Sequence, residues 1–201
     1  MDRAWALPMN RAGLLRTGVG GGAAALLGLG VWAGRAAAAV PDVDLSYLRL
    51  LVATELLKAD FATRAGASGK LSKPAAALVQ HMRKADTTHY TGLAALMSEA
   101  GQPPATSGDI DFSYPRGSFA SARSTATLGW KLTSLAVGAY LGALEQVQTP
   151  SIRLPLAQIA ANEAQQQSAL AALVGRPAIG DAFAAALPID VVSAALDDYE
   201  S

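Results

Sequence analysis

The sequence contains no cysteine, which excludes disulfide bonds and leaves no site for lipid attachment of the lipoprotein kind. Aromatic residues make up only 6% of the chain, and basic residues form no run and do not alternate with aromatic ones. These absences argue against nucleic acid as a partner. Long β-branched runs are also lacking, whereas alanine and leucine are abundant, so the composition favours helices throughout.

The first 39 residues have the pattern of an export signal. Arg3, Arg11 and Arg16 precede an apolar stretch from Gly18 to about Gly34, and four alanines before Val40 supply a small-residue cleavage site. The apolar stretch is shorter than the roughly 20 residues that span a bilayer comfortably. We therefore predict cleavage after residue 39 and an exported protein of the periplasm, cell envelope or extracellular space. A retained signal that anchors the chain in a membrane is the alternative.

The segment from Asn10 to Arg16 resembles a twin-arginine export signal, which has two adjacent arginines, any residue, two hydrophobic residues and a basic one. Ala12 stands where the second arginine is expected. The export route is therefore either the general secretory one or a degenerate twin-arginine one.

The remaining 162 residues, 40–201, have the size of one domain. Without the signal, 12 basic and 15 acidic residues remain, a net charge of about −3. Apolar periodicity and stop signals predict four long helices and a short C-terminal one. We place Asp44 at the N-cap of the first helix and Pro74 and Pro155 in the first turns of the second and fourth. The predicted ranges are about 44–65, 72–101, 118 or 121–148, 151–175 and 188–199.

The lengths of the connections predict an all-α four-helix bundle. Short loops join the first two helices and the last two, so each pair forms an antiparallel hairpin, and the long segment 101–117 crosses from one hairpin to the other. A cytokine-like bundle needs two long crossovers, which the short turn near residue 150 excludes. An up-down-up-down bundle would not need so long a connection here.

Polar residues interrupt the apolar stripe of every long helix. Residues equidistant from a hairpin turn lie at the same height, and Glu55 with Asp86 and Thr133 with Glu163 satisfy that condition. The residues therefore form one predicted layer across the core: Glu55, Asp86, His89, Thr133, Glu163 and Gln166.

Three carboxylates in one core require compensation, because burial disfavours their charged form. His89 is the only buried cation that we expect in this layer, since lysines and arginines fall mostly on other faces of the helices. Either a metal ion supplies positive charge, or some of the acids are protonated and hydrogen-bonded.

These residues resemble the metal site of the ferritin-like superfamily, in particular exported ferritin-like domain proteins similar to desiccation-related proteins. That family carries Glu, Glu-x-x-His, Glu and Glu-x-x-His on its four helices and binds two metal ions. Glu55, His89 and Glu163 match, and Asp86 stands in place of a glutamate. The segments Tyr140-Leu-Gly-Ala-Leu and Ile159-Ala-Ala-Asn-Glu163 are also similar to the family's sequences.

The resemblance implies that the site is incomplete on one side. Thr133 and Gln166 replace ligands of the second metal, whereas Glu55, Asp86, His89 and Glu163 could hold one ion of iron, manganese or zinc. Three hypotheses follow for the function. The first is an exported protein that binds at most one metal ion and has a metal-handling or stress role, without robust oxidase turnover. The second is a metal-free helical scaffold or protein-interaction module, and the third is a di-iron oxidase.

Other polar and aromatic residues of the helices receive plainer interpretations. We interpret Glu145 as a solvated charge at the rim, since its position relative to the turn does not match that of Glu163. We expect His81 to be a surface histidine. The aromatic residues are expected to pack in or against the core: Tyr90, Tyr140, Trp130 and Phe61. The protein could form a homo-oligomer, but nothing in the sequence supports a cage like that of iron-storage ferritins.

Overall fold

Four long helices and one short one make up the part of the chain that the structure, a computed structural model, describes, which is residues 40–201. The predicted export signal and its cleavage site lie outside these described residues. Within them, no helix combines the length and the hydrophobicity needed to cross a membrane. The helices are α2 (Asp42–Ala67), α3 (Lys73–Glu99), α4 (Ala122–Gln146), α5 (Pro150–Leu173) and α6 (Ile189–Asp197).

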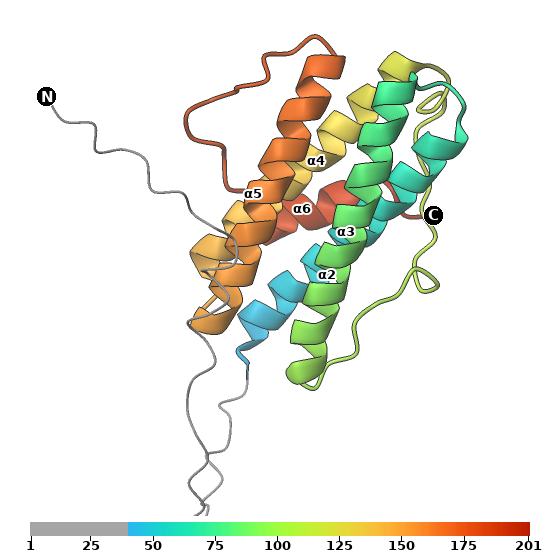
Figure 1. The fold of residues 1–201 in the computed structure, drawn as a ribbon. Helices are drawn as coiled ribbons and strands as arrows, with labels where there is room; N and C mark the ends of the chain where they lie inside the picture. The colour runs from blue at the N-terminus through green and yellow to red at the C-terminus, as the bar shows by residue number, and fades with distance from the viewer. Residues whose placement is uncertain (1–39) are drawn as a thin grey trace, which may run out of the picture. The chain divides into compact units, whose positions relative to one another are not determined.

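The long helices form two antiparallel hairpins, α2 with α3 and α4 with α5 (Figure 1). The hairpins meet mainly through α2 and α4, and α6 packs on both of these helices. A long connection, 100–121, returns along the bundle so that α4 starts near the end of α2 (Figure 1). This arrangement confirms the predicted all-α bundle of two hairpins with one crossover and a short C-terminal helix.

The helix boundaries follow the chemistry of their end residues. The Ser72 hydroxyl accepts a hydrogen bond from the Ala75 amide, and Pro74 lies in the first turn of α3. Gly101 follows α3 with a φ of 72°, a left-handed conformation that suits glycine after a helix end. Ser121 and Ser124 cap the start of α4 reciprocally.

Asp44 does not cap α2, so that prediction is wrong. Helix α2 begins two residues earlier, at Asp42, and the Asp44 side chain reaches across to the turn between α4 and α5. Its two carboxylate oxygens accept hydrogen bonds from the backbone N–H groups of Gln148 and Thr149, each at 2.8 Å. Because Thr149 makes no side-chain cap of its own, Asp44 caps α5 from a different helix.

The turn between α4 and α5 begins slightly before its predicted position. Helix α4 ends at Gln146, because Val147 is fully buried in an extended conformation. Helix α5 begins at Pro150, so Pro155 lies just beyond the first turn and not within it. The Arg153 side chain donates two hydrogen bonds to the Val147 carbonyl and holds the turn closed.

The crossover is fastened to α2 by aromatic side chains. The Tyr114 hydroxyl lies 2.9 Å from the Asp60 carboxylate and 3.2 Å from the Leu57 carbonyl. The ring of Phe119 stacks on that of Phe61, with 6.0 Å between centroids. These contacts place the crossover against the core, so its apolar residues contribute to stability.

Helix α2 is buried on nearly all sides. It contacts α3, α4 and α6, and the crossover covers part of its remaining surface. As a result its buried residues extend well beyond a single stripe and include the polar residues Thr54, Glu55 and Lys58. A helix in this central position can therefore deliver several polar side chains to the core.

Candidate metal centre

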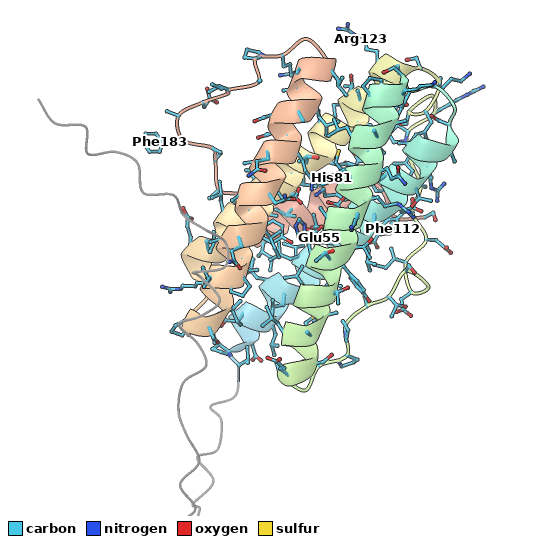
Figure 2. The ribbon with its side chains drawn as sticks, in the orientation of Figure 1. Glu55, His81, Phe112, Arg123 and Phe183 are labelled. Carbon is cyan, nitrogen blue, oxygen red and sulfur yellow. The ribbon has the colours of Figure 1, made fainter. Side chains whose placement is uncertain are left out.

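The structure brings together the four residues that the sequence singled out as potential ligands. One ligand atom from each of Glu55, Asp86, His89 and Glu163 lies within 4.8 Å of the others. The three carboxylates are fully buried, whereas the His89 side chain is 11% exposed. Figure 2 shows Glu55 in the middle of the bundle, in the region between α3 and α5. The cluster therefore lies deep in the core, and among its four members only His89 touches solvent.

Lys58 is a fifth member of this cluster and was not predicted from the sequence. Its side chain is fully buried, and Nζ lies 2.9 Å from Asp86 Oδ1 and also pairs with Glu163 Oε2. The expectation that His89 is the only buried cation is therefore wrong. The spacing could have revealed Lys58, since it stands three residues after Glu55, as His89 does after Asp86.

His89 faces the other acids of the cluster. Its Nδ1 atom lies 3.3 Å from Glu163 Oε1 and 3.4 Å from Glu55 Oε2. These distances allow ion pairing, but neither carboxylate is aligned for a hydrogen bond to that nitrogen. Glu163 thus faces His89 with one oxygen and Lys58 with the other.

Helix α4 contributes Tyr140 to the cluster. The buried Tyr140 hydroxyl donates a hydrogen bond of 2.5 Å to Glu55 Oε1. Tyr140 therefore both fills the core and supports an acid. Thr133, which we predicted in the layer, is buried but donates its hydroxyl to the Gly129 carbonyl of its own helix.

Gln166 joins the cluster from α5 through its amide nitrogen. That Nε2 atom donates to Asp86 Oδ1 at 3.1 Å and to the neighbouring Asn162 side chain at 3.0 Å. Two donors, Lys58 and Gln166, thus converge on one oxygen of Asp86. The Gln166 carbonyl oxygen is buried without a hydrogen-bond partner among the described residues.

Burial and neighbouring charges shift the pKa values in opposite directions. Burial lowers the pKa of His89, but its contacts with Glu163 and Glu55 outweigh burial and raise the pKa to about 9. Burial raises the pKa of Asp86 to about 6, although Lys58 opposes that change. The acids also outweigh the effect of burial on Lys58, so its pKa lies above the ordinary value. Lys58 and His89 are therefore the cationic side chains of the cluster at neutral pH, and His89 must release a proton to bind a metal ion.

One buried atom on each of three potential ligands has no hydrogen-bond partner among the described residues. These atoms are Glu55 Oε2, Asp86 Oδ2 and His89 Nδ1. Buried polar atoms without partners are uncommon in native proteins, because each costs about 1–3 kcal/mol. The cluster therefore has unused capacity to bind a cation.

The cluster has two sides that share Glu163. We call Glu55, His89 and Glu163 Oε1 the histidine side, and Lys58, Asp86 Oδ1, Gln166 and Glu163 Oε2 the lysine side. On the lysine side, the ammonium group of Lys58 supplies positive charge. The histidine side holds two of the three unpartnered ligand atoms.

The remaining candidates lie outside the cluster. Glu145 is exposed, in agreement with its interpretation as a rim charge, and His81 is exposed on α3 (Figure 2). Tyr90 is half-buried and donates to the Ala105 carbonyl. Trp130 packs beneath the guanidinium group of Arg176, whose Cζ atom lies 3.9 Å from the centroid of the ring.

A family model described as a ferritin-like domain matches residues 43–176, which include α3, α4, α5, all but the first residue of α2, and every member of the cluster. No curated protein shows significant similarity to the chain.

Proposed function

Since the chain belongs to the ferritin-like domain family, we propose that it binds one divalent metal ion through Glu55, Asp86, His89 and Glu163. The observation that carries this proposal is the convergence of four potential ligand atoms within 4.8 Å, three of them from fully buried carboxylates. A site of three carboxylates and one imidazole is rich in hard oxygen ligands and suits manganese, iron or zinc.

The unpartnered atoms of the cluster fit such an ion. Glu55 Oε2 and His89 Nδ1 are buried, close to each other and without hydrogen bonds, as expected of atoms that bind a cation. A bound divalent ion would supply the positive charge that balances the acids. The protein's contribution is to hold these groups in place, with Tyr140 fixing the carboxylate of Glu55.

Two ions do not fit the cluster as it stands. Lys58 pairs with both Asp86 and Glu163, so its positive charge repels a second cation from these two carboxylates. Glu145 of α4 is exposed, so it brings no further carboxylate to the cluster. We therefore do not assign di-iron oxidase activity to this chain.

The biological role that we propose is metal handling or a stress function after export. The export part rests on the pattern of residues 1–39, in which Arg3, Arg11 and Arg16 precede an apolar stretch and a small-residue cleavage site. In such a role the bound ion is cargo or a structural element.

A metal-free scaffold is the second candidate, and the ammonium group of Lys58 favours it. Lys58 already neutralises part of the negative charge of the acids, so less charge is left for a metal ion to balance. The connection between α5 and α6 exposes the apolar side chains of Ile179 and Phe183, which would then be available to a partner. Figure 2 shows Phe183 on this connection.

Thermal unfolding with and without added metal tests the proposal. An ion that binds only the folded state at 100 times its Kd adds about 2.7 kcal/mol, which raises the Tm of a domain this size by about 5–10 °C. We expect that rise with Mn²⁺ or Zn²⁺ in the wild-type protein. The double variant Glu55→Gln/His89→Gln should abolish it, because both ligands of the histidine side are lost while Lys58 keeps its partners.

The matched control carries the same two changes at exposed positions, His81→Gln with Glu145→Gln. This control should retain the full metal-dependent rise in Tm. If the wild-type Tm does not respond to either metal, or if the Glu55/His89 variant responds equally, the proposed site is refuted.

A further inference from the structure

We propose that the ammonium group of Lys58 occupies a cation position in this layer that a second metal ion would otherwise take. The inference rests on the proposed function, since it assigns the layer two cation positions and gives one of them to a metal ion. It makes Lys58 the residue that determines how many ions the site accepts.

The contacts of Nζ are those of a bridging cation. Lys58 Nζ interacts with one oxygen from Asp86 on α3 and one oxygen from Glu163 on α5. It therefore joins the two hairpins through carboxylates, as a metal ion between two bridging carboxylates would. The buried ammonium makes no other hydrogen bond within the described residues, so both of its bonds go to acids of the layer.

The position of Lys58 coincides with the side where the ligand set is incomplete. Gln166, which stands where the family has a histidine, shares Asp86 Oδ1 with Lys58. Thr133, which stands where the family has a glutamate, bonds to its own helix and offers no charge. A fixed positive charge and two uncharged replacements thus occur together, whereas the histidine side keeps Glu55 and His89.

The charge balance agrees with this assignment. A lysine in the core is costly unless its charge is paired, because several kcal/mol of hydration are lost on burial. Two carboxylates contact Lys58, and a third carboxylate, that of Glu55, lies in the same cluster. The ammonium group supplies one positive charge that is covalently attached to the chain. The remaining negative charge of the carboxylates can be balanced by one divalent ion on the histidine side, once His89 binds that ion as a neutral imidazole.

The test is the Mn²⁺ stoichiometry of Lys58→Met compared with that of the wild-type protein, measured by equilibrium dialysis after metal removal. Methionine keeps a long apolar side chain and removes the charge. We expect one Mn²⁺ per wild-type chain and two per variant chain. The control Lys131→Met changes an exposed lysine of α4 and should bind one ion.

A second measurement keeps the test informative if Lys58→Met folds poorly without metal. Loss of Lys58 leaves Asp86 and Glu163 unpaired, so the variant should unfold at a much lower temperature in EDTA and recover when Mn²⁺ is added. The double variant Lys58→Met/Asp86→Asn removes one charge of each sign. It should fold in EDTA, which would show that the instability of Lys58→Met comes from the carboxylates that lost their cation.

The outcomes separate this inference from the proposed function. One ion in both the wild-type protein and Lys58→Met overturns the role of Lys58 and leaves the proposed site intact. No ion in the wild-type protein but one or more in Lys58→Met supports the role of Lys58 and overturns the proposed function. No ion in either protein overturns both.

Discussion

Replacing Tyr140 with phenylalanine tests how the core holds the Glu55 carboxylate. The Tyr140 hydroxyl donates a 2.5 Å hydrogen bond to Glu55 Oε1, and both side chains are fully buried. Burial and the negative charge of Glu55 raise the pKa of Tyr140 well above its ordinary value, so the hydroxyl stays a donor at all working pH values. Phenylalanine keeps the ring and removes only this donor.

The expected loss of stability follows from the charge on the acceptor. Hydrogen bonds to charged groups contribute about 1.5–3 kcal/mol, and the deleted hydroxyl also leaves a buried carboxylate oxygen unsatisfied. We therefore expect Tyr140→Phe to lower the free energy of unfolding by about 2–3 kcal/mol in EDTA. The corresponding drop in Tm is about 4–12 °C for a domain of this size.

Chemical denaturation in EDTA and in saturating Mn²⁺ is the appropriate assay. The loss should be smaller with Mn²⁺, because an ion on Glu55 compensates in part for the missing donor. Tyr90→Phe is the control, since its half-buried hydroxyl donates to a neutral carbonyl at 3.0 Å and should cost about 1 kcal/mol. If Tyr140→Phe is as stable as the wild-type protein within about 0.5 kcal/mol, the hydrogen bond does not stabilise Glu55 as argued.

Two further substitutions test the packing that positions the site. Asp44→Asn should cost about 1–2 kcal/mol at neutral pH, because an amide can accept only one of the two backbone hydrogen bonds at the start of α5. Burial raises the pKa of Asp44, but its hydrogen bonds outweigh that and lower it below 3.8. Its contribution is therefore present above pH 3.8 and is lost as pH falls through the folded-state pKa, so urea denaturation should show the variant and the wild type converging in acid. Gly142→Ala should cost about 1–3 kcal/mol, since a Cβ there would overlap the Leu187 carbonyl before α6. Gly92→Ala, in an open position on α3, should be neutral or stabilising by up to about 1 kcal/mol; equal costs at the two glycines would refute the close approach.

The fold could be predicted because local and global signals agree along the chain. Apolar periodicity, a serine and a proline at the start of α3, and the glycine after it fixed that helix closely. Connection lengths then left one arrangement of the hairpins. Asp44 was misassigned because a carboxylate near a helix start is usually its cap, and only the three-dimensional structure brings the turn at residues 148 and 149 within its reach.

The site could be predicted only in part, for a reason that Lys58 illustrates. The acids and His89 were found because each interrupts the apolar stripe of a helix. Predicting buried residues from an apolar stripe presupposes that a helix buries only one face. Helix α2, however, is enclosed by three helices and the crossover. Lysine at such a position is not recognisable as buried until its carboxylate partners on other helices are known.

The role of Tyr140 was hidden for a related reason. An aromatic residue in an apolar stripe is most simply explained as core packing, and Tyr140 is indeed fully buried. Its hydroxyl, however, meets Glu55, which lies 85 residues earlier in the chain. Sequence spacing within one helix carries no information about such a contact.

The number of metal ions bound per wild-type chain tests the central claim most directly. The protein would be stripped with a chelator, dialysed to equilibrium against increasing Mn²⁺, and analysed for metal and protein content. One ion per chain at saturation is the predicted result, with Lys58 supplying the other cation of the layer. Zero ions per chain would contradict the proposed metal site. Two ions per chain would contradict the proposal that the Lys58 ammonium group occupies the second cation position.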